Sequence, residues 1–265
     1  MFKGIGTCTS IFGHRNLLTP ERIKYLKDSG MEYIEISALQ TLHFDMHNKR
    51  HVESIAKAIK KNKIKVWSFH APFTPIAMMD EPTRKEGIQL IVEACSLQEL
   101  FGFEVIVMHQ GSDDPKGEKK KEIANFRKSM KEIVKRTGKT KLALETTGHY
   151  RPKPSDVLMD VLSDFDDKKV GICVDTGHVR LAEDVAPAIY KFGKRIYSVH
   201  IQDNDGRSDL HMLPFSGVIK WNEVFKALKD VGYSGVFMYE GADPGKNTKE
   251  NMIKMKMVYK KAISM

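Results

Sequence analysis

Short apolar runs alternate with amphipathic segments along the whole chain, and this alternation predicts a repeated strand–helix unit. Eight runs have the length and residue types of strands: residues 2–9, 33–38, 65–73, 104–111, 141–148, 169–178, 195–203 and 235–241. Apolar residues recur at helical spacing in residues 20–30, 51–62, 86–102, 123–133, 155–165, 185–192, 221–232 and 252–263. No linker or low-complexity segment interrupts the series.

Eight strand–helix units in 265 residues predict an α/β protein, a (β/α)8 TIM barrel that forms one domain over residues 1–265. The alternative is an open, doubly wound parallel sheet. Such a sheet more usually has five or six strands and a GxGxxG turn after the first of them. The first strand reads GIGTCT, which does not match that fingerprint, so we favour the barrel.

Composition excludes several classes of protein. The chain is 41% hydrophobic and 29% charged, which is typical of a globular domain and not of a disordered or fibrous one. Cys8, Cys95 and Cys173 are far apart and form no CxxC pair, which argues against a disulfide framework and against thiolate zinc. The N-terminus has no signal-like apolar stretch, and no apolar run approaches the ~20 residues that cross a bilayer. We therefore expect a cytoplasmic protein without a membrane partner, whose oligomeric state stays open.

The net charge of +9 allows a polyanionic partner such as DNA, but also small anionic metabolites. Many of the cationic residues fall in one stretch, Lys116–Lys141, which overlaps a predicted helix with Ile123, Phe126 and Ile133 on its apolar face. We interpret this stretch as the solvated outer face of that helix. Charge alone therefore does not identify the partner.

Imidazoles and carboxylates occur where predicted strands end or in the loops directly after them. They are His70, His109, Glu145, Asp175, His178, His200, Asp209, His211 and Glu240. In a (β/α)8 barrel these positions converge on the face that holds the active site. Crowded carboxylates repel one another unless cations pair with them, and buried charges are normally paired or bound to metals. Imidazole and carboxylate without thiolate suits Zn²⁺, Mn²⁺, Fe²⁺ or Co²⁺, so we predict a multinuclear metal site.

Six strand-end runs resemble the xylose-isomerase-like barrel superfamily, which includes sugar isomerases, sugar epimerases and the endonuclease IV type of abasic-site endonuclease. The runs are SFHAPF, VIVMHQG, LALETTG, GICVDTGH, SVHIQDNDGRSDLH with LPFSGVIKW, and VFMYEG. The sequences between the ligands are most similar to the group called sugar phosphate isomerase/epimerase-like. That group usually has Pro-Gly-x-Gly where this chain has Pro214, Phe215, Ser216 and Gly217, which implies a differently shaped loop.

The resemblance implies roles for the strand-end residues. In both branches Glu145, Asp175, His200 and Glu240 match a four-residue metal site. In the endonuclease branch, the residues that match His70 and His109 share a metal with Glu145, and those that match His178, Asp209 and His211 hold a third. The resemblance therefore implies one to three divalent ions per chain, with zinc or manganese as the expected metal.

Three alternatives for the function remain as expectations, the first two of them implied by this resemblance. The first is a metal-dependent sugar or sugar phosphate isomerase or epimerase, in which Glu145 and Glu240 exchange protons next to a metal-bound carbonyl and Asp203, Asn204 and Arg207 bind the substrate. The second is a multinuclear zinc phosphodiesterase that acts on abasic-site DNA. A metal-binding barrel with another role, such as a dehydratase or an inactive regulator, is a third. The sequence favours the first.

Overall fold

The computed structural model describes residues 2–110, 119–147 and 153–264, and it confirms the predicted (β/α)8 barrel. Eight parallel strands form one sheet in the order β7-β6-β5-β4-β3-β2-β1-β8. A parallel bridge between Ile201 and Tyr239 joins the end of β7 to β8 and closes the ring. The strands are β1 (Gly4–Cys8), β2 (Tyr33–Ser37), β3 (Lys65–His70), β4 (Val105–Met108), β5 (Lys141–Glu145), β6 (Val170–Asp175), β7 (Ile196–His200) and β8 (Val236–Tyr239).

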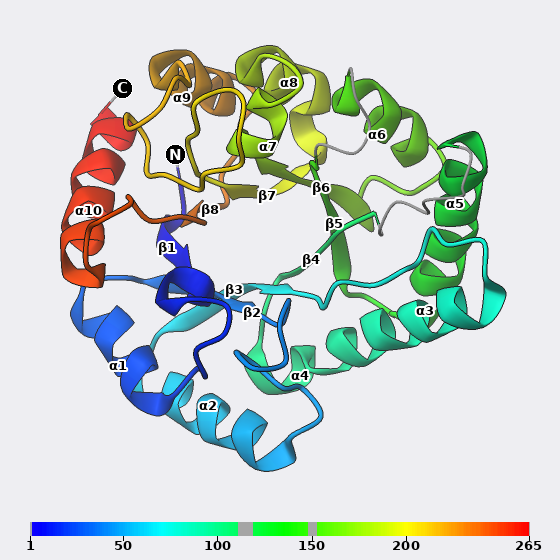
Figure 1. Cartoon of the computed structure of the whole chain (residues 1–265), viewed down its shortest axis with the longest axis horizontal. Coiled ribbons are helices and arrows are strands. Elements are labelled where there is room, and N and C mark those ends of the chain that lie inside the picture. The colour runs from blue at the N-terminus through cyan, green and yellow to red at the C-terminus, as the bar shows by residue number, and fades with distance from the viewer. Residues whose placement is uncertain (1, 111–118, 148–152, 265) are drawn as a thin grey trace.

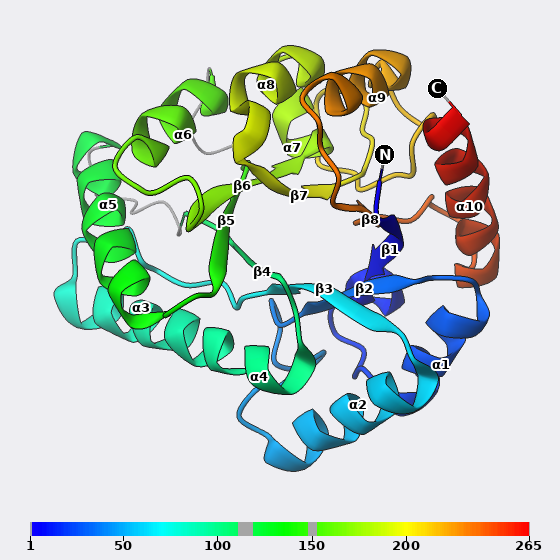
Figure 2. The same cartoon turned by 180° about the vertical axis from the view of Figure 1, so that it is seen from behind.

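Helices surround the strands on the outside, as Figures 1 and 2 show from the two ends of the barrel. They are α1 (Pro20–Asp28), α2 (Lys49–Asn62), α3 (Glu81–Ser96), α4 (Gln98–Phe101), α5 (Lys119–Arg136), α6 (Pro154–Leu162), α7 (Thr176–Arg180), α8 (Val185–Phe192), α9 (Trp221–Asp230) and α10 (Thr248–Ser264). Two short 3₁₀ turns, η1 (Thr9–Phe12) and η3 (Gly193–Arg195), complete the described elements. The main core lies between the helices and the outer face of the sheet.

Two helices differ from the predicted pattern. The helix expected over residues 86–102 begins at Glu81, because the Asp80 carboxylate accepts a hydrogen bond from the Thr83 N–H, and it divides at Leu97 into α3 and α4. The sequence did not predict α7. Its N-cap is Asp175, whose carboxylate accepts a hydrogen bond from the His178 N–H at 2.7 Å.

The lysine-rich helix α5 lies on the outside of the barrel, as predicted. Phe126, Met130 and Ile133 are fully buried against the core. On its outer side Lys128 pairs with Glu81 of α3. Neighbouring helices therefore compensate part of its positive charge. Lys116, at the start of the predicted basic stretch, lies outside the described residues.

Irregular pairing in two strands sets which side chains face the barrel interior. Ile34 pairs with Val66 whereas Glu35 pairs with Ser68, so Trp67 has no partner on β2. The same shift in β7 leaves Tyr197 without a partner on β6. Such bulges re-aim the side chains that follow them, often next to active sites. Here they precede His70 and His200, the last residues of their strands.

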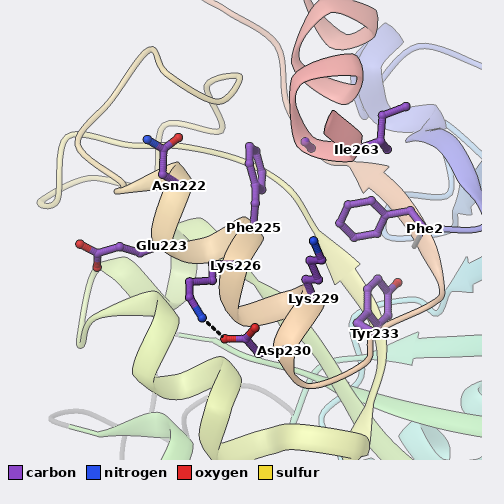
Figure 3. Close-up of a pocket in the computed structure, with 10 residues that line it drawn as sticks. Phe2, Asn222, Glu223, Phe225, Lys226, Lys229, Asp230, Tyr233 and Ile263 are labelled. Carbon is purple, nitrogen blue, oxygen red and sulfur yellow. Dashed lines mark hydrogen bonds and ion pairs between the residues drawn. The ribbon is translucent and has the colours of Figure 1, made fainter. Parts of the chain in front are cut away.

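A cavity of about 630 Å³ lies between α9, α10 and the N-terminal Phe2 (Figure 3). It is lined by Phe225, Tyr233 and Ile263, and by none of the nine predicted metal ligands. Tyr233 precedes β8, so this cavity is near the strand starts rather than the strand ends. In the described part of the chain, no helix has the combined length and apolar character that crossing a bilayer requires.

Candidate metal centre

The sheet register brings the predicted ligands together at the carboxyl ends of the strands. Asp175 pairs with His200, and Glu145 pairs with Cys173, two residues before Asp175. Alternation along each strand then turns these polar side chains towards the barrel axis. Ala143 pairs with Gly171 below them, so small residues lie under the polar ends of these two strands.

Glu145, Asp175, His200 and Glu240 form a central cluster. One ligand atom from each lies within 4.8 Å of the others, and all four residues are at most 4% exposed. The Nδ1 atom of His200 is 2.7 Å from Oε2 of Glu240, yet both atoms lack a partner with hydrogen-bond geometry. Buried polar atoms are almost always satisfied, so these two atoms fit the ligands of a bound cation. One imidazole and three carboxylates are a donor set that binds zinc or manganese.

A second cluster shares Glu145 with the central one. The Nε2 atoms of His70 and His109 both lie 2.9 Å from Oε2 of Glu145. His70 is the last residue of β3 and is buried, whereas His109 follows β4 and is slightly exposed. Glu145 therefore belongs to both clusters, which is the arrangement of a carboxylate that bridges two sites.

The third cluster, His178, Asp209 and His211, is the most exposed of the three. Oδ2 of Asp209 lies 3.0 Å from Nε2 of His178 and 3.1 Å from Nε2 of His211. The cap that Asp175 provides for α7 places His178 on the first turn, where its Nδ1 is 3.1 Å from Oε1 of Glu145. His211 has a positive φ of 47°, a conformation uncommon outside glycine that often occurs at functional sites.

Burial and neighbouring charges shift the pKa values of these groups in both directions. Burial raises the pKa of Asp175 to about 7. Burial alone would lower the pKa of His70, but the hydrogen bond and charge of Glu145 outweigh it and raise that pKa to about 8. In the same way Asp209 raises the pKa of His211 to about 10. For Glu240 the charge of His200 outweighs burial, and the pKa falls to about 2.

The hydrogen bonds of the three predicted substrate-binding residues go to groups outside these clusters. The Asp203 carboxylate is fully buried and accepts hydrogen bonds from the Trp221 indole and from backbone N–H groups of residues 204, 217 and 219. Asn204 is also buried, and it bonds the carbonyl of Gly177 and the N–H of Gly206. Both side chains hold the loop between β7 and α9, and we do not retain them as substrate ligands. Arg207 is exposed in the same loop.

Sequence reasoning missed three residues near the clusters. Glu35 and Cys8 lie fully or almost fully buried, and their ligand atoms are within 4.8 Å of Glu240. Phe73, which is 50% exposed, places its ring centroid 4.3 Å from that of His109. For Glu35 the sequence held a signal, because it is the one charged residue in the apolar strand YIEIS.

Comparison with known proteins identifies the family. The model of the xylose isomerase-like TIM barrel family matches residues 23–257. The chain belongs to this family. Among solved members of the same fold, a D-tagatose 3-epimerase-like protein superposes with a TM-score of 0.84 at 23% identity, covering 98% of this chain and 97% of the other. The IolI protein, solved with a bound zinc atom, superposes with a TM-score of 0.82 at 19% identity, covering 98% of both chains.

Two curated relatives also align with the chain. The uncharacterized protein MJ1311 of Methanocaldococcus jannaschii is 31% identical over 183 residues, which are 64% of this chain and 62% of the relative. The alignment thus spans less than two thirds of MJ1311. The 3-dehydro-D-guloside 4-epimerase of Escherichia coli is 25% identical over 256 residues, covering 89% of this chain and 91% of the enzyme. Homologues of this chain therefore include sugar epimerases.

Proposed function

We propose that this family member is a divalent-metal-dependent sugar or sugar phosphate epimerase or isomerase. The observation that supports it most is the central cluster, with its two unsatisfied buried atoms on His200 and Glu240. Alignment with the Escherichia coli epimerase over most of both chains supports the sugar substrate class. The zinc bound in the IolI structure supports a metal in this fold.

Glu145, Asp175, His200 and Glu240 would hold the cation. A divalent cation in this position supplies a Lewis acid that polarises the substrate carbonyl and stabilises negative charge beside it. With the cation bound, its ligands would be three ionised carboxylates and one neutral imidazole. His70 and His109, both hydrogen-bonded to Glu145, orient its carboxylate.

Glu145 and Glu240 are the proposed acid/base pair. They extend from β5 and β8, with β6 and β7 between them, so they approach a substrate at the strand ends from two sides. Burial raises the pKa of each, but the neighbouring histidines outweigh it and hold both pKa values below the ordinary range. Both groups are therefore bases at neutral pH. One carboxylate would remove the proton from the carbon beside the carbonyl, and the other, after taking up a proton from solvent, would deliver it to the opposite face of that carbon. The first carboxylate would then release its proton to solvent.

Arg207 is the proposed contact for a substrate phosphate or hydroxyl. Its backbone N–H donates to Asp205 at 2.8 Å, and its side chain is exposed in the loop after β7. Guanidinium groups bind phosphate through paired hydrogen bonds, which suits this role.

Solvent deuterium exchange into ketoses and ketose phosphates tests the acid/base assignment. We expect metal-loaded protein to lose the NMR signal of the proton beside the carbonyl, and Glu145→Gln or Glu240→Gln to slow that loss by about 10²–10⁴-fold. Glu53→Gln, on the exposed face of α2, is the matched control and should exchange at the wild-type rate. Wild-type exchange rates in both active-site variants would contradict the assignment.

A second candidate is the multinuclear phosphodiesterase acting on abasic-site DNA, which the two additional clusters favour. Elemental analysis of the wild type and of the double variant His70→Ala with His109→Ala distinguishes the two candidate functions. One cation per chain that the variant retains supports the epimerase. Two or three zinc ions, with at least one lost in the variant, support the phosphodiesterase, and abasic-site DNA is then the substrate to assay. Absence of any metal uptake would contradict both.

A further inference from the structure

Glu35 is a carboxylate in the barrel interior to which the proposed reaction assigns no role. It lies on β2 between Ile34 and Ile36, and it is fully buried. A buried carboxylate is stable only with partners that compensate its charge. Its imidazole partner is across the barrel on β7: Nε2 of His200 is 3.0 Å from Oε1 and 3.1 Å from Oε2 of Glu35.

This contact determines which nitrogen of His200 is available to the central cluster. A neutral imidazole has one N–H donor and one acceptor nitrogen. Because Glu35 accepts the Nε2–H, the lone pair remains on Nδ1. That atom lies 2.7 Å from Oε2 of Glu240, 3.5 Å from Oε1 of Glu145 and 3.9 Å from Oδ2 of Asp175.

Glu35 is itself held by the irregular pairing of β3. The register shift at Trp67 places Ser68 beside Glu35, and the Ser68 hydroxyl donates to Oε2 at 2.6 Å. The carboxylate therefore has a fixed orientation before any ligand binds. Ser68, Glu35 and His200 form a continuous hydrogen-bonded chain from β3 through β2 to β7.

We propose that Glu35 is a positioning residue that holds His200 as its Nε2–H tautomer, with Nδ1 turned to the cation of the central cluster. The inference rests on the proposed function only in requiring that this cluster bind a metal. Residues that orient a metal-bound histidine from behind typically change metal affinity by 10–100-fold when they are replaced. Glu35 acts through His200, so its replacement should lower metal affinity without removing a ligand.

Long-range ¹⁵N–¹H NMR of histidine-labelled protein during a zinc titration tests this directly, because it reads His200 itself. In zinc-loaded wild type we expect a metal-bound Nδ1 and a protonated Nε2. Glu35→Leu, which removes the acceptor, should raise the zinc concentration that half-saturates His200 by about 10–100-fold. Glu35→Gln keeps an oxygen that accepts the Nε2–H and should stay within about threefold of wild type.

Two further variants control for folding. Ser68→Ala leaves every carboxylate in place and should cause a smaller loss than Glu35→Leu. Glu32→Gln removes an exposed carboxylate just before β2 and should bind zinc like wild type. Zinc bound through Nε2, unchanged affinity in folded Glu35→Leu, or no effect of zinc on His200 in wild type would each overturn the inference. Zinc binding as expected without proton exchange in sugars would reject the proposed function and leave the role of Glu35 standing.

Discussion

At the scale of single residues, the site is a set of buried groups that hold protons which a metal ion would displace. Asp175 and His70 have raised pKa values of about 7 and about 8. His70 shares its proton with Glu145, whose pKa burial would raise but the surrounding histidines lower. The proposed cation would therefore compete with protons for these atoms.

The metal-free protein should lose stability as the pH rises from 6 to 9. His70, His211 and Asp175 all have folded-state pKa values above their ordinary ones, so in this window the folded state binds more protons than the unfolded state. Stability then decreases with rising pH through about 7, 8 and 10. Calorimetric melting of chelator-treated protein at a series of pH values measures this loss of stability. Zinc-loaded protein is the control and should show the opposite trend, because its ligands are deprotonated; a metal-free melting temperature that rises over this range would contradict the argument.

Nine ligand candidates could be predicted from the sequence because each lies at a predicted strand end or in the loop directly after it. Glu35 could not be assigned a role in the same way. It lies in the middle of its strand, and its partner His200 is 165 residues away on the far side of the barrel. The loop contacts of Asp203 could not be predicted for a related reason: its four hydrogen-bond donors come from the folded-back loop up to Trp221, which no local pattern reveals.

At the scale of elements, the loop between β7 and α9 (gold in Figure 1) supplies Asp209 and His211 and is held by its own buried contacts. Phe215 occupies the place of the usual glycine with a φ of 68°, which costs a non-glycine residue about 1–2 kcal/mol. Its ring packs near Trp221 and below the Lys261 ammonium, 4.1 Å from the ring centroid. These contacts offset the backbone strain.

Replacement of Gly217 in this loop should disturb the third cluster. A Cβ atom at Gly217 would lie 2.1 Å from the Asn204 carbonyl oxygen, so Gly217→Ala must displace the loop. We expect a loss of about 3 kcal/mol in unfolding free energy, because the loop that carries Asp209 and His211 must move. Gly245→Ala, at a positive φ of 73° in open space, controls for backbone strain alone and should cost about 1 kcal/mol. Equal losses in the two variants, measured by denaturant unfolding, would contradict this prediction.

Helix boundaries were predictable where capping residues lie close to the apolar pattern. Thr19 caps α1 and Pro20 is its first residue, where the sequence predicts that helix to begin. The five-residue α7 was not predictable in this way. It forms because the Asp175 carboxylate caps it, and that cap depends on where β6 ends in the barrel.

At the scale of the whole molecule, the positive charge of α5 lies away from the candidate site. Helix α5 lies on the periphery, where Lys131 pairs with Asp164 and Lys128 with Glu81. Surface pairs of this kind contribute little to stability and are screened by salt. The basic helix is therefore an outer, solvated face.

Charge reversal on α5 should leave catalysis unchanged. Lys128→Glu combined with Lys131→Glu places like charges beside Glu81 and Asp164, so we expect a lower melting temperature at low salt. The steady-state kcat/KM for a substrate of the proposed epimerase should stay within about twofold, because the helix is outside the barrel. Lys260→Glu, on the exposed side of α10, is the charge-matched control. A tenfold fall in kcat/KM for the α5 variant alone would show that this face takes part in substrate binding.

The sequence by itself determined the repeated strand–helix unit, the barrel and the nine strand-end ligand candidates, because periodicity and strand ends are local properties. The tertiary structure decided which candidates meet. Closure of the ring brings Glu240 after β8 next to His200 on β7, and two register shifts turn Ser68 and His200 towards Glu35. The tertiary structure also decided the contacts of Asp203, whose side chain holds the loop between β7 and α9. These outcomes depend on distances across the barrel, which are set only when all eight strands are in register.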